Sequence, residues 1–126
     1  MLKFILIVAA IFGGFKYGGG YLLSEDFQQY ADRSKSPWTC YLDNTFGDFH
    51  MTMSNYQSAY YRFSHSVARC PDSSAGERAQ FEVAHSLELA GDRNGAALEY
   101  DKYVKKYPET KRARIAQRSV DLLRGP

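Results

Sequence analysis

Hydrophobic and polar residues alternate over residues 91–108 with the period of a helix that buries one face. Residues on that face recur at intervals of four, three and four positions, and they are Ala96, Tyr100, Tyr103 and Tyr107. Gly91 can end a preceding helix in the left-handed conformation, and Asp92 can cap the next helix. Pro108 disfavours helical geometry in the residue before it, so the helix ends there.

Four further helices follow from the same kind of pattern, and their ranges are about 38–52, 55–69, 75–90 and 111–123. Ser54 with Gln57, and Ser74 with Glu77, form capping-box patterns before the second and third of these helices. Gly47 is unfavourable inside a helix unless a neighbouring backbone approaches closely there. The chain is therefore predicted to be all-α.

Residues 37 positions apart resemble one another through these helices. The matching pairs are Ala59 and Ala96, Phe63 and Tyr100, Cys70 and Tyr107, and Pro71 and Pro108. In the other helices of the series, the residues that correspond to Val83 and Ala84 are Phe46 and Gly47. The apolar faces are incomplete alone, so each helix pair is expected to bury its face against the next.

These positions give the chain a resemblance to the tetratricopeptide repeat. In that family a helix pair of about 34 residues carries a turn glycine, then a small residue, an aromatic residue and a closing proline. The second unit of this chain has all four in order and spacing, as Gly91, Ala96, Tyr100 and Pro108. The first unit has Ser54 at the turn and matches the other three positions with Ala59, Phe63 and Pro71.

Phe46-Gly47 and Val83-Ala84 suit the signature of the first helix in the family's repeat. Asp43 and Gln80 stand where an aromatic residue is expected. The period of 37 is most similar to the long-period branch that includes bacterial outer-membrane-assembly lipoproteins and the Tol-Pal coordinator. The resemblance implies about two helical hairpins and a closing helix, with a protein-binding role. It departs from the lipoproteins because no lipid-acceptor cysteine directly follows the N-terminal apolar segment.

The implied hairpin places Cys40 and Cys70 close together. With the turn near Ser54, Cys40 lies fourteen residues before the turn and Cys70 sixteen after it, so both fall at the same open end. A disulfide there would close a loop of about 30 residues and add roughly 3 kcal/mol of stability. Export favours this bond over two free thiols, which are the alternative.

Residues 4–23 form a second landmark, because Lys3 precedes an apolar run that ends in a glycine-rich stretch. These 20 residues would span roughly 30 Å as a helix, enough to cross a hydrocarbon core if Lys16 snorkels or faces a protein partner. Gly14 and Gly18 have the spacing of close-packed membrane helices, with a flexible hinge or a weak cleavage region as the alternative. A membrane anchor is preferred to a cleaved signal peptide, since no small-x-small cleavage site follows, and to a soluble core helix.

This prediction divides the chain into an anchor or signal segment at 1–23, a polar stalk or linker at 24–37 and a helical domain at 38–126. Lys3 would hold the N-terminus inside and send the remainder across the membrane. The expected location of the helical domain is the periplasmic side of a bacterial inner membrane.

The net charge of +2 favours no particular partner, but the charge is unevenly distributed. Residues 71–100 carry six acids and two bases (net −4), while residues 101–126 carry eight bases and three acids (net +5). A basic C-terminal helix could meet an acidic protein, anionic lipid or nucleic acid. A solvated helix face is the preferred interpretation, and no nucleic-acid partner is expected.

No catalytic or metal-binding pattern occurs in the sequence. His50, His65 and His85 are scattered without zinc-like spacing, and phosphate-loop, nucleophile-elbow and zinc-protease motifs are missing. We therefore expect neither an enzyme nor a cofactor-binding protein. The aromatic excess of ten Tyr and eight Phe favours contact with other proteins. The candidate partner-binding residues are Tyr60, Tyr61 and Tyr103, although a core position for Tyr103 is an open alternative.

The expected function is a non-catalytic, membrane-tethered protein–protein interaction module or an accessory subunit of a larger membrane or envelope complex. The alternative is a soluble periplasmic accessory factor that signal-peptide cleavage releases.

Overall fold

The structure, a computed structural model, describes residues 2, 3, 5 and 37–125. Residues 37–125 contain five α-helices and no strand: α4 (Pro37–Thr52), α5 (Tyr56–Arg69), α6 (Ser74–Leu89), α7 (Arg93–Lys106) and α8 (Lys111–Arg124). The all-α prediction is confirmed for this part of the chain, and the four ranges predicted above are each correct to within one residue at either end.

The predicted anchor lies almost wholly outside the described residues, and Gly14, Lys16 and Gly18 are among those not described. Within the described residues, none of the helices combines the length and the apolar character needed to cross a bilayer.

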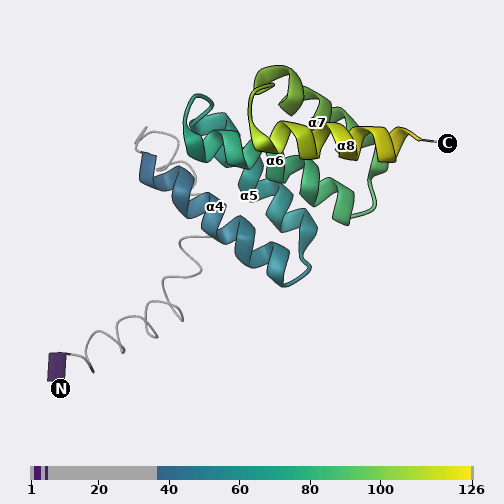
Figure 1. The fold of residues 1–126 in the computed structure, drawn as a ribbon. Coiled ribbons are helices and arrows are strands. Elements are labelled where there is room, and N and C mark those ends of the chain that lie inside the picture. Colours follow the sequence, from purple (N-terminus) through teal and green to yellow (C-terminus); the bar gives the residue numbers. More distant parts are fainter. Residues whose placement is uncertain (1, 4, 6–36, 126) are drawn as a thin grey trace. The chain divides into compact units, whose positions relative to one another are not determined.

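Each helix packs against the next one along the chain, and α4 also touches α6 (Figure 1). α6 therefore takes part in two groups of buried side chains. Its Ala79 and Val83 join Ala59 and Phe63 of α5 in the first group. Ala84 joins the second group, which α7 and α8 complete with Ala96, Tyr100, Tyr103, Ala113, Ala116 and Val120.

The turn between α4 and α5 has the same backbone geometry as the turn 37 residues later between α6 and α7. Ser54 has φ 58° and Gly91 has φ 90°, so both occupy the left-handed region. After Ser54, the Asn55 amide donates to the His50 carbonyl at 2.8 Å, and after Gly91 the Asp92 amide donates to the Leu87 carbonyl at 2.9 Å. Both helices thus end in the same hydrogen-bonded motif, with the expected glycine in only one of them.

The left-handed backbone at Ser54 also corrects the first predicted capping box. A residue that ends α4 in this conformation cannot take the extended conformation of a helix N-cap. Asn55 is the N-cap of α5, and its side chain makes no capping hydrogen bond. The cap predicted at Asp92 is confirmed, since its carboxylate accepts from the Gly95 amide at 2.9 Å.

The second predicted capping box is wrong by one residue. Ser73, not Ser74, caps α6, and its hydroxyl oxygen accepts from the Gly76 amide at 3.0 Å. The equivalent residue 37 positions later, Thr110, caps α8 by accepting from the Ala113 amide at 3.1 Å. Each of these hydroxyls also donates to the carbonyl of the residue that directly follows the preceding helix, Cys70 or Tyr107, so the cap fixes the whole turn.

The glycine in α4 marks a close approach, but by a side chain and not by the backbone that we expected. A Cβ atom at Gly47 would lie 2.6 Å from two ring carbons of Phe63, which is fully buried. The corresponding residues of the second unit are Ala84 and Tyr100, which lie together in the core. A small residue on one helix therefore makes room for a ring from the next.

Exchanging serine and glycine at the two equivalent turns tests this geometry. Ser54→Gly should raise the free energy of unfolding by about 0.5–1 kcal/mol, because relief of left-handed strain exceeds the unfolded-state entropy that glycine adds. Gly91→Ser should lower it by about 1 kcal/mol. A Cβ at Gly91 would meet nothing within 4 Å, so this cost comes from the backbone alone. Urea denaturation followed by circular dichroism measures both, and opposite signs are required.

Candidate functional site

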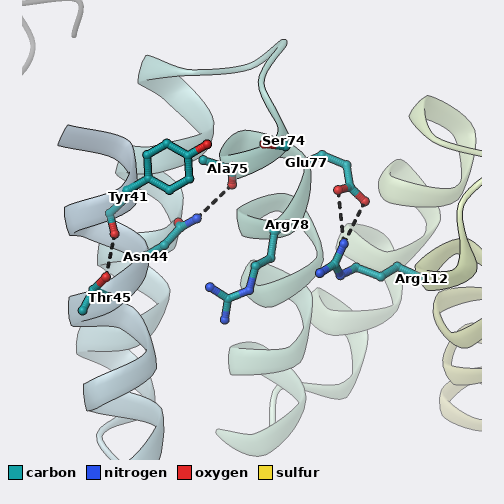
Figure 2. Close-up of a pocket in the computed structure, with 8 residues that line it drawn as sticks. All are labelled: Tyr41, Asn44, Thr45, Ser74, Ala75, Glu77, Arg78 and Arg112. Carbon is teal, nitrogen blue, oxygen red and sulfur yellow. Dashed lines mark hydrogen bonds and ion pairs between the residues drawn. The ribbon is translucent and has the colours of Figure 1, made fainter. Parts of the chain in front are cut away.

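A polar cavity of about 340 Å³ opens where α4, α6 and α8 come together (Figure 2). Helical spacing places its lining residues on the facing sides of these helices. From α4 they are Tyr41, Asn44 and Thr45; from α6 they are Ser74, Ala75, Glu77 and Arg78; and from α8 the lining residue is Arg112. We call this cavity the α4–α6–α8 groove.

Asn44 has an acceptor atom in this groove that the fold does not use. Its side chain amide donates to the Ala75 carbonyl at 3.0 Å, as Figure 2 shows, and the residue is only 4% exposed. Its Oδ1 atom has no hydrogen-bond partner among the described residues. The Oδ1 atom is itself buried, so leaving it unpaired costs about 1–3 kcal/mol.

Two arginines give the same groove hydrogen-bond donors. Arg78 of α6 pairs with Asp48 of α4, and Arg112 of α8 pairs with Glu77 of α6 at 3.2 Å. Hydrogen bonding to Asp48 raises the pKa of the Arg78 guanidinium, which therefore stays charged. Each guanidinium carries five N–H donors, more than one carboxylate oxygen can occupy. The groove can thus both accept from and donate to a bound chain.

A buried ionic cluster lies on α4 and α5, outside the residues that line the groove. Asp43 is 1% exposed and accepts from Arg62 at 3.2 Å and from Arg69. Burial raises the pKa of the Asp43 carboxyl, while the charges of Arg69 and Arg62 oppose that shift. The Arg62 guanidinium also lies 5.0 Å from the ring centre of Phe46. Sequence reasoning noted Asp43 only as a departure from an expected aromatic residue and missed both arginines.

Cys40 and Cys70 form a disulfide in the structure, with their Cα atoms 6.4 Å apart. The bond joins the first turn of α4 to the end of α5, at the open end of this helix pair. Beside it, the Ser66 hydroxyl donates to the Cys40 carbonyl at 3.4 Å. The cross-link therefore lies next to the buried Asp43 cluster.

Tyr103 is not a surface residue, in contrast to its selection as a partner-binding candidate. Its side chain is fully buried, and its hydroxyl donates to Glu77 and lies 2.9 Å from the Thr110 hydroxyl. Burial, together with the hydrogen bond to Glu77, raises its pKa to about 12. Its ring contacts Phe81 and Tyr107 edge-on or tilted, so Tyr103 belongs to the core.

The other two tyrosine candidates are accessible on α5. Tyr61 is 52% exposed and its ring contacts that of His65, with 4.4 Å between ring centres. Tyr60 lines a second cavity of about 250 Å³ between α5, α6 and α7. Neither of them reaches the α4–α6–α8 groove. The exposed aromatic side chain that does line the groove is Tyr41, which sequence reasoning did not select.

The histidines have ordinary surroundings. His85 pairs with Glu82 at 3.2 Å, and this hydrogen bond raises the pKa of the imidazole. Burial, with the Arg62 charge nearby, lowers the pKa of His50. No group of three or more His, Cys, Asp or Glu residues in the described ranges is arranged to hold a metal ion.

No family model, curated protein or solved structure matches this chain. The functional assignment therefore depends on the chain's own residues.

The contribution of the disulfide can be measured in the doubly substituted protein Cys40→Ser, Cys70→Ser. Its free energy of unfolding should fall by about 3 kcal/mol, because the unfolded chain regains the freedom of a long loop. Addition of a reductant should destabilise the natural protein by the same amount and leave the variant unchanged. Two free thiols in the unfolded, unreduced natural protein would show that the bond is absent.

Proposed function

We propose that this chain is a protein–protein interaction module of the tetratricopeptide type that acts by binding and not by catalysis. In this assignment α4 with α5 and α6 with α7 are the two hairpins, and α8 is the closing helix. Support comes from the paired turns at Ser54 and Gly91, which repeat after 37 residues. Further support comes from the signature positions that lie in the core, namely Ala59, Phe63, Val83, Ala84, Ala96 and Tyr100.

The α4–α6–α8 groove is proposed as the binding site, and its ligand as an extended segment of another protein. The guanidinium groups of Arg78 and Arg112 carry this assignment, because they line the groove from two different helices and have more donors than their carboxylate partners occupy. Arg78 and Arg112 can donate to a carbonyl or a carboxylate of the same segment. The lining combines amide, hydroxyl and guanidinium groups, which suits recognition of a polypeptide backbone.

Two threonines on α4 provide a matched test of this site. Each donates its hydroxyl to the carbonyl four residues earlier, Thr45 to Tyr41 and Thr52 to Asp48, and both are exposed. Thr45 lines the groove, whereas Thr52 is not among the residues that line it. The same substitution at the two positions therefore differs mainly in whether it fills the groove.

The full chain in amphipol is used to select binders from a display library of random peptides. Peptides that bind should lose about tenfold or more in affinity with Thr45→Arg, which blocks the groove, and keep their affinity with Thr52→Arg. Recovery of no peptide, or equal binding to the two arginine variants, would contradict the proposed site.

We further propose that residues 4–23 tether the module to a membrane, where it docks onto or forms part of a larger envelope complex. The support is the basic start followed by an apolar run long enough to span the bilayer. The alternative is a periplasmic factor released by signal cleavage, which the same basic start and apolar run would also permit.

Intact mass separates the tethered protein from the released one. The protein isolated from the membrane fraction should have the mass of the whole chain, because a retained anchor keeps residues 1–23. A species lacking the N-terminal segment, found in the soluble fraction, would establish the released form instead. A chain expressed with Lys16→Leu serves as a control for extraction, since its anchor is more apolar.

A further inference from the structure

The outer face of α8 combines basic and aliphatic side chains that the fold does not cover. Residues at intervals of four, three and four positions form one stripe along this helix, namely Lys111, Ile115, Arg118 and Leu122. The opposite side of α8 is buried mainly against α7 through Ala113, Ala116 and Val120. Ile115 is 53% exposed and Leu122 is 71% exposed.

Charge alone would suit a solvated helix face, but the aliphatic pair does not. Ile115 and Leu122 are seven residues apart, the spacing at which side chains on successive double turns meet a partner helix. Lys111, Arg114 and Arg118 flank them, and none of the three makes an ion pair with the described residues. The stripe therefore resembles one side of a helix–helix contact whose basic side chains have no ion-pair partner among the described residues.

We propose that this face of α8 docks an acidic amphipathic helix of another protein. Each helix from α4 to α8 packs against the next one along the chain, so a partner helix on the outer face of α8 would continue this packing (Figure 1). Its leucine-like side chains would cover Ile115 and Leu122, and its carboxylates would pair with Lys111, Arg114 and Arg118. This surface is separate from the α4–α6–α8 groove, and the inference does not depend on peptide binding there.

Two other occupants fit less well. A second copy of the chain offers no open acidic stripe on α6 or α7, because its carboxylates there are already bonded, namely Glu77, Glu82, Glu88, Glu99 and Asp101. An anionic lipid surface favours helices with a broad apolar face and aromatic anchors, whereas α8 presents two aliphatic side chains and no aromatic one.

The probe is a synthetic peptide with leucines at heptad positions and glutamates on either side, compared with an isomer whose leucines are redistributed around the helix. Binding to the full chain in amphipol is followed by fluorescence anisotropy. The heptad peptide should bind about tenfold more weakly to the variant Ile115→Ser, Leu122→Ser and to the variant Arg114→Glu, Arg118→Glu. The single variant Leu122→Ser should show part of this loss.

The matched control is Lys102→Glu, Lys105→Glu on α7, which changes the charge equally at exposed positions elsewhere. It should bind the peptide like the natural protein, and all variants should keep the helical circular dichroism of the natural protein, because every substituted side chain is exposed. Equal binding of the two peptides, equal loss in the control, or no binding at all would overturn the proposal. Binding to phosphatidylglycerol vesicles that depends on Ile115 and Leu122, in place of peptide binding, would also overturn it. Self-association in light scattering that depends on the same two residues would do so too.

Discussion

The fit of a ring against a small residue is the constraint on which the helix stack depends. Phe63 occupies the space that a Cβ at Gly47 would need, so α5 can approach α4 only because residue 47 has no side chain. Ala84 and Tyr100, at the equivalent positions, lie together in the second group of core residues. Because the interior is close-packed, the size of one residue sets how near the next helix can lie. The approach of successive helices in turn decides where α4, α6 and α8 face one another and form the groove.

The two units hold their helices together at equivalent positions by different interactions. In the first unit the disulfide joins Cys40 to Cys70, and the Ser66 hydroxyl bonds to the Cys40 carbonyl. The residues 37 positions later are Glu77, Tyr107 and Tyr103, and here Glu77 accepts from Tyr103 while also pairing with Arg112. Near the position equivalent to the first unit's disulfide, the second unit thus has a partly buried hydrogen bond between Tyr103 and Glu77. Since Glu77 and Arg112 also line the groove, the polar side of the proposed site is fixed by the core of the second unit.

Periodicity and turn chemistry predicted the helices because both are local properties of the chain. How deeply a side chain is buried, and which distant residue it contacts, are not local properties. The predictions were incomplete on both. The spacing of Tyr100, Tyr103 and Tyr107 gives their common face, but only the packing of α6 and α8 shows that Tyr103 is fully buried. The cluster of Asp43 with Arg62 and Arg69 joins residues 19 and 26 positions apart. The buried Asn44 side chain likewise donates to the carbonyl of Ala75, 31 positions away. No short motif marks such contacts.

α8 brings these features together because its sides serve different purposes. Ala113, Ala116 and Val120 close the core, Arg112 reaches the groove, and the stripe from Lys111 to Leu122 faces outward. The outward face meets water, and its basic residues favour that contact. Ile115 and Leu122 do not contribute to it, and they do not support the core either. Repeated spacing in the two units therefore accounts for the scaffold, and the recognition proposed above uses residues that the repeat does not require.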